Sequence, residues 1–218
     1  DVLEDGTVQY NATENTLTLQ GATLTQAGDQ DGVVCATGDL RVATLGKNNI
    51  TGTGADGINI SGALTMSGSG TLDVQTKNAE NICISASSAQ FSGGTYTLGS
   101  AGIVIWTWTA SGDLDISGNS IIHASSPNHY AIYSAGRILI SENAQVQSET
   151  GAYGVGLYAA SDIEISGGTV EAQSEASNAI YSGGSITING GKITAKSLGD
   201  APAVWCNNAL TITDGELI

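Results

Sequence analysis

Short apolar segments recur along the chain at nearly constant spacing. Each reads apolar–x–apolar and is followed by a turn of small residues, as in LTMSGSG from Leu64 and IEISGG from Ile163. Nine segments begin at Leu17, Leu40, Leu64, Ala89, Leu114, Ile138, Ile163, Ile186 and Leu210, so that successive starts differ by 23–25 residues. Self-similarity at such a period is typical of a solenoid, in which each repeat buries its apolar face against its neighbours.

Apolar and polar residues alternate within each repeat, which predicts β-strands and no helix. A second strand follows the turn and places one apolar residue inside: Leu24, Ile50, Leu72, Tyr96, Ile121, Val146, Val170, Ile193 and Leu217. A third strand follows a longer polar turn, as in AIYS from Ala131 and AVWC from Ala203. We therefore predict an all-β fold, a single-stranded right-handed parallel β-helix of about nine coils of 23–25 residues.

Two other repeat architectures do not fit this pattern. Leucine-rich repeats carry an asparagine-anchored leucine signature that is missing here, and a propeller blade needs about 40 residues. We expect residues 1–16 to cap the first coil and residues 17–218 to form one β-helix domain. Because the last residues lie inside the repeat pattern, we expect the natural protein to continue beyond them.

The charge balance narrows the choice of partners. The chain carries a net charge of −15 with only six lysines and arginines, so its surface repels phosphate backbones and anionic lipids. No run approaches the ~18 apolar residues of a membrane helix. We expect neither nucleic-acid binding nor membrane insertion, and a monomer within a larger multidomain protein.

Two stretches resemble a known group of proteins. The segments GINISGALTMSGSGTLDV (Gly57 to Val74) and GTVQYNATENTLTLQGATLT (Gly6 to Thr25) are similar to secreted bacterial β-helix domains of the pectate-lyase-like superfamily. More narrowly they resemble the carbohydrate-binding-type surface domains of Gram-positive gut bacteria. The resemblance implies an extracellular or cell-surface location in a bacterium and a polysaccharide or other glycan as partner.

No catalytic constellation stands out. Pectate lyases combine acidic calcium ligands with a basic residue, and polygalacturonases carry NTD, DD, GHG and RIK segments, none of which occurs here. Asp115 and Glu164 should face outward two coils apart, ~10 Å by strand spacing, whereas inverting glycosidases hold their carboxylates ~6.5–9.5 Å apart. We place His123 inside the coil and His129 in an exposed turn. We assign no catalytic residue and no cofactor.

Metal and disulfide chemistry are not expected either. Most of the long turns offer one acid each, apart from the pair Asp29 and Asp31, while calcium takes six to eight oxygens. We predict no tight metal site. Cys35, Cys83 and Cys206 are placed outward on third strands, too far apart for a disulfide.

One feature suggests a function. Aromatic residues follow the inward position of four consecutive third strands, at Tyr133, Tyr158, Tyr181 and Trp205, with Trp106 and Trp108 on the adjoining region. If the rings offer their faces to sugars, neighbouring amides could bind hydroxyls; the candidates are Asn128, Asn178, Asn207 and Asn208. The alternative is that the rings stabilise the ladder by packing. The leading hypothesis is a non-catalytic glycan-binding or adhesive domain; the alternatives are a structural spacer and an unrecognised polysaccharide lyase or hydrolase.

Overall fold

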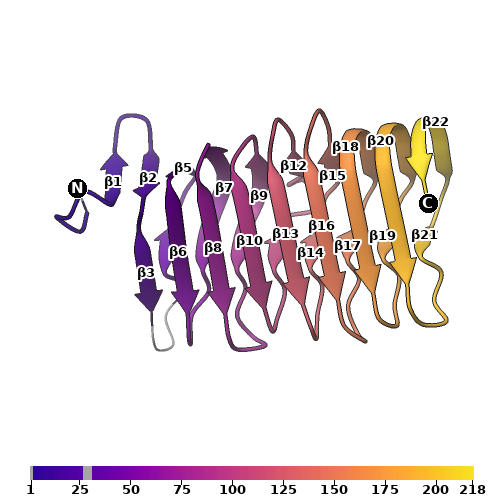
Figure 1. The fold of residues 1–218 in the computed structure, drawn as a ribbon, viewed down its shortest axis with the longest axis horizontal. Helices are drawn as coiled ribbons and strands as arrows, with labels where there is room; N and C mark the ends of the chain where they lie inside the picture. Colours follow the sequence, from indigo (N-terminus) through magenta and orange to yellow (C-terminus); the bar gives the residue numbers. More distant parts are fainter. Residues whose placement is uncertain (1, 27–30) are drawn as a thin grey trace.

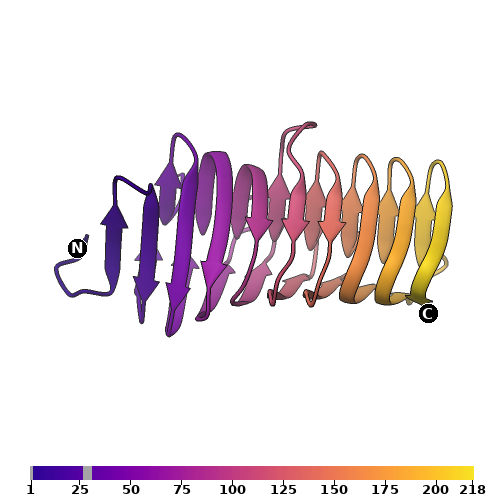
Figure 2. The same cartoon turned by 90° about the horizontal axis from the view of Figure 1, so that it is seen from above.

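The chain folds into a rod of stacked coils. The computed structural model describes residues 2–26 and 31–218, and these form a parallel β-solenoid of about eight turns (Figures 1 and 2). Nine segment starts delimit eight complete turns, and no helix occurs among the described residues. The prediction of an all-β parallel solenoid is confirmed. Asp29 lies outside the described residues.

Three faces run along the rod. The first face contains β2 (Thr16–Gln20), β5 (Leu40–Leu45), the ends of β7 (Ile58–Gly68) and β9 (Ile84–Phe91), β12 (Leu114–Ile116), β15 (Ile138–Ile140), and the beginnings of β18 (Ile163–Ser174), β20 (Ile186–Ser197) and β22 (Leu210–Leu217). The second face contains β3 (Thr23–Gln26), β6 (Lys47–Gly52), β8 (Thr71–Thr76), β10 (Thr95–Ser100), β13 (Ile121–Ser126), β16 (Gln145–Thr150), and the ends of β18, β20 and β22. The third face contains β4 (Val34–Ala36), the beginnings of β7 and β9, β11 (Ile105–Thr107), β14 (Ile132–Ser134), β17 (Leu157–Ala159), β19 (Ile180–Ser182) and β21 (Val204–Cys206).

Nearly every described strand pairs in parallel with the strand one coil away. The exception is β1 (Val8–Asn11), which forms an antiparallel hairpin with β2 at the N-terminal end of the rod (Figure 1). The hairpin lies where a cap is expected, and the division into residues 1–16 and 17–218 stays a prediction.

The core is a set of apolar rows along the rod. On the first face, one row contains Leu40, Leu64, Ala89, Leu114, Ile138, Ile163 and Ile186, all of them buried as predicted. Because every inward residue contacts its equivalents in the coils before and after, the core is continuous.

The phase of two segments differs from the prediction. Leu17 pairs with Val42, not with Leu40, so the first coil is displaced by two residues. On the second face Tyr96 pairs with Ile122, which is fully buried, while Ile121 is only partly so. A slip of one residue moves every side chain of a strand to the opposite face, and His123 is therefore outward, not inward.

The turn between the first and second faces contains a residue in the left-handed backbone conformation, with positive φ. A glycine with positive φ occupies it in most coils, for example Gly94 (φ 88°) and Gly168 (φ 77°). Glu142 takes that position in one coil with φ 60°, and its carboxylate accepts a hydrogen bond from the backbone N–H of Gly118 in the preceding coil at 2.8 Å. This bond links the two coils across the turn.

The turn between the third and first faces is held by aspartates. Asp39, Asp113 and Asp162 each accept a hydrogen bond through Oδ1 from a backbone N–H of the following coil, at 2.8, 3.0 and 2.7 Å. These carboxylates link successive coils, which explains several acids as structural. None of the described residues forms an apolar helix long enough to cross a membrane.

Candidate functional site

Five aromatic side chains lie in one outward row on the third face. The strand register pairs Trp106 with Tyr133, Tyr133 with Tyr158, Tyr158 with Tyr181, and Tyr181 with Trp205. We call these five residues the aromatic row. Trp106 belongs to the row itself, and its placement on an adjoining region was wrong.

Trp106 did not fit the spacing expected from the sequence because the turns differ in length from coil to coil. Paired inward residues on the third face lie 21 residues apart between Ile84 and Ile105, but 27 apart between Ile105 and Ile132. Counting back from a coil start therefore misplaces β11 by three residues. The remaining members of this row are Cys35, Asn59 and Ser85, so the prediction that Cys83 occupies it was also wrong.

The three tyrosines of the row stack face to face. The ring centroids of Tyr133 and Tyr158 are 4.7 Å apart with planes inclined by 7°, and those of Tyr158 and Tyr181 are 4.9 Å apart with planes inclined by 2°. The reason is that strands one coil apart are separated by about 4.8 Å, which is also a good stacking distance. The faces of Tyr158 are covered on both sides, so the hypothesis that each ring of the row offers its face to a sugar does not hold for Tyr158.

Tyr130, in the turn before β14, completes a tyrosine cluster. Its ring lies 5.3 Å from Tyr133 and 5.2 Å from Tyr158, tilted against both, and it also contacts His129. The tyrosines are half-buried. Burial raises the pKa of the Tyr158 and Tyr130 hydroxyls, and the neighbouring tyrosines raise it further. The cluster presents ring edges and hydroxyls, and a tyrosine hydroxyl both donates and accepts hydrogen bonds.

Trp205 forms the open end of the aromatic row. It is 48% exposed, more than any other member. Its indole N–H donates to Oδ1 of Asn207 at 3.0 Å, and the hydroxyl of Tyr181 donates to the same oxygen at 3.4 Å. Asn207 thus orients Trp205 beside Tyr181, and its amide nitrogen is left to donate to a ligand.

The other predicted binding residues are more dispersed. The amide of Asn178 donates to the carbonyl of Pro202 at 2.6 Å, which links two long turns. Trp108 is 41% exposed but lies just after β11, outside the row. Asn128 and Asn208 are exposed. Only Asn207 of the four asparagines bonds to a ring of the row among the described residues.

The described histidines, the three cysteines and the two acids singled out from the sequence lie on different strands and turns. His123 and His129 are both exposed. Cys35, Cys83 and Cys206 are free thiols; burial raises the pKa of Cys83, which faces inward, to about 12. Asp115 and Glu164 lie two coils apart with Leu139 between them, as predicted. No cluster of three or more metal-ligating side chains occurs among the described residues.

The fold and the row define a class of protein, a β-solenoid with a partly exposed tyrosine cluster on one face. A family model described as "Carbohydrate-binding domain-containing protein" matches residues 4–217, and the chain belongs to this family. Neither the curated proteins nor the solved structures contain a match.

Proposed function

We propose that this domain is a non-catalytic glycan-binding module of an extracellular or cell-surface protein, and that the aromatic row is its binding surface. The observation that carries the proposal is the alignment of five aromatic side chains on consecutive coils. The first three coils place Cys35, Asn59 and Ser85 at the equivalent positions, so the solenoid itself does not require rings there. Exposed aromatic groups with polar neighbours are typical of interaction sites.

The stacked geometry assigns different tasks to the rings. Trp205, the most exposed ring, offers a stacking surface for a sugar ring. The tyrosine hydroxyls and the free amide hydrogens of Asn207 supply hydrogen bonds to sugar hydroxyls. Equivalent hydroxyls recur at about 4.8 Å along the row, so the surface suits an extended chain that lies along the rod.

Binding measurements on variants test the proposal. Wild type and Trp205→Ala are compared on an array of neutral and acidic oligosaccharides, and affinities are then measured by calorimetry. Loss of an aromatic anchor commonly costs about 2 kcal/mol, roughly a thirtyfold weakening. Tyr153→Ala is the matched control, because Tyr153 is 85% exposed in a turn away from the row. Unchanged binding by Trp205→Ala would refute the assignment of the row.

A structural spacer is the second candidate, favoured by the stacking itself. Rings that contact each other on three successive coils stabilise the ladder whether or not a ligand binds. This function predicts that Tyr181→Ala lowers stability while no glycan on the array binds the wild type.

A further inference from the structure

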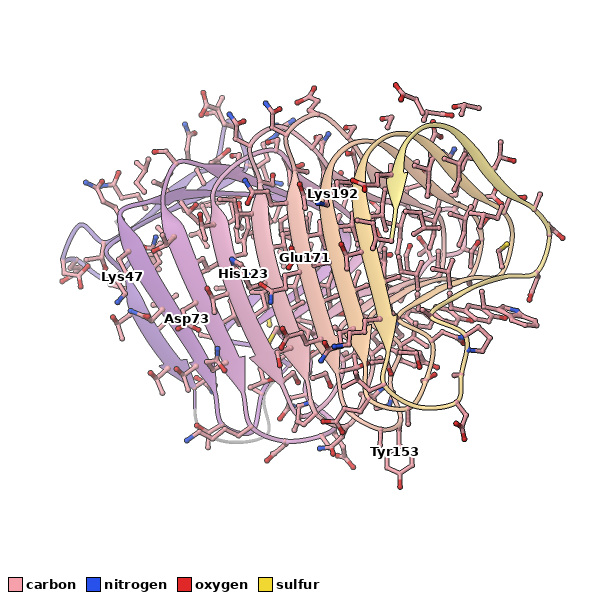
Figure 3. The ribbon with its side chains drawn as sticks, turned by 45° about the vertical axis from the view of Figure 1, so that its right-hand side comes forward. Lys47, Asp73, His123, Tyr153, Glu171 and Lys192 are labelled. Carbon is pink, nitrogen blue, oxygen red and sulfur yellow. The ribbon has the colours of Figure 1, made fainter. Side chains whose placement is uncertain are left out.

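The second face carries a hollow that is separate from the aromatic row. A cavity of about 450 Å³ opens over β8, β10, β13 and β16, a size within the range of small-molecule sites. Its floor contains Gly99, which lies between Gln75 and Ser125 in one outward row. Figure 3 shows Asp73, His123 and Glu171 one after another along the outer face of the strands.

One wall of the hollow is a chain of hydrogen bonds whose direction is chemically determined. Nε2 of Gln147 lies 2.8 Å from Oε1 of Glu149, and a carboxylate only accepts, so the amide nitrogen donates. The amide oxygen of Gln147 then faces Nδ1 of His123 at 2.8 Å, and that nitrogen must carry the proton. In the neutral imidazole, Nε2 is therefore an acceptor, and Glu149 keeps a second acceptor oxygen.

The opposite wall also turns hydrogen-bond acceptors towards the hollow. Nε2 of Gln75 donates to Oδ1 of Asp73 at 2.7 Å, which directs the amide oxygen of Gln75 away from that carboxylate. This oxygen lies over Gly99, at 2.5 Å from the position that a Cβ there would take. Both walls thus offer acceptors, and no lysine or arginine lines the hollow in the described part of the chain. A ligand must supply several donors and carry no negative charge.

We propose that this hollow is a second saccharide-binding subsite, which takes a unit of a neutral, hydroxyl-rich glycan. Sugar hydroxyls donate to Gln75, His123 and Glu149, while an acidic sugar is repelled by Asp73 and Glu149. The inference goes beyond the aromatic row, because it concerns another face of the rod and different side chains.

Substitution of Gly99 by glutamine fills the hollow without straining the backbone. The φ of Gly99 is not in the left-handed region, and the three atoms nearest to an added Cβ all belong to the flexible end of Gln75. Glutamine already occupies the same outward row at Gln75 and Gln173. Thr51→Gln is the matched control, since Thr51 lies in that row beside Gln75 but does not line the hollow.

The test is a nuclear magnetic resonance titration of the labelled chain with neutral tetrasaccharides of xylose, glucose and mannose, and with tetragalacturonate. We expect a neutral sugar to shift the Gly99 amide and the His123 imidazole, and Gly99→Gln to weaken that response about tenfold or more. Thr51→Gln should respond as the wild type does, and Gln75→Ala should bind more weakly.

Three outcomes overturn the inference: no neutral sugar shifts either signal, Gly99→Gln responds like the wild type, or tetragalacturonate binds more tightly than the neutral sugars. The Trp205 indole signal reports on the aromatic row in the same titration. A response at Trp205 without one at Gly99 removes the second subsite and leaves the proposed function. A response at Gly99 without one at Trp205 supports the second subsite and contradicts the assignment of the aromatic row.

Discussion

Truncation of Tyr158 tests whether the stacked tyrosines stabilise the rod. The ring of Tyr158 contacts three others, those of Tyr130, Tyr133 and Tyr181. An aromatic contact contributes about 0.5–1.5 kcal/mol beyond the buried area, so Tyr158→Ala should lower the free energy of unfolding by about 2–4 kcal/mol. Tyr158→Phe keeps the rings in contact and should lose less than about 1 kcal/mol.

Equilibrium unfolding in urea measures the effect, with the midpoint compared at constant slope. Tyr153→Ala is the control, because Tyr153 is 85% exposed and surface substitutions usually stay within about 0.5 kcal/mol. If Tyr158→Ala is no more destabilising than Tyr153→Ala, the stack contributes nothing and the stability argument for the row is wrong.

Three further predictions concern pH and the turns. The pKa values of Tyr158 and Tyr130 are raised in the folded protein. The stability that these two hydroxyls contribute is therefore fully present below the unfolded pKa of about 10 and is lost as pH rises through the folded pKa. Tyr158→Phe should flatten this alkaline loss of stability, measured by urea titrations at several pH values. Gly112→Ala should destabilise the protein by about 3 kcal/mol or more, because the added Cβ would collide with the carbonyl oxygen of Ser87. Gly38→Ala is the control in the equivalent GDL turn: its added Cβ meets nothing within 4 Å, so the melting temperature should stay unchanged or rise slightly. Arg137→Met should lower the free energy of unfolding by less than about 1 kcal/mol, since the ion pair with Asp113 at 2.7 Å is partly exposed. Asp113→Ala should lower it by about 1–2 kcal/mol, because the backbone N–H of Arg137 also loses its partner. Equal losses for the two variants in chemical denaturation would contradict this ranking.

The period and the alternation of apolar residues were sufficient to predict the solenoid. The first-face residues such as Leu64, Ile138 and Ile163 are buried as expected, because a residue that repeats every coil can only pack against its own equivalents. The same regularity correctly placed Tyr133, Tyr158, Tyr181 and Trp205 in one row. These features depend on local alternation and spacing, which the sequence displays directly.

What the pattern could not determine is the phase after an irregular turn. Trp106, His123 and Cys83 were all misplaced, because turn lengths vary from coil to coil and one residue of slip exchanges inside for outside. Only pairing with the neighbouring strand determines which residue of a short segment is opposite which.

The orientation of side chains depends on neighbours that are distant in sequence. Tyr158 stacks on rings about one coil before and one coil after it, and the hollow at Gly99 exists because Gln75 and His123 flank it from adjacent strands. The sequence by itself determined that aromatic and polar side chains face outward in rows. The tertiary structure decided that the tyrosines cover one another's faces, because strands about 4.8 Å apart leave room for stacked rings and for nothing between them.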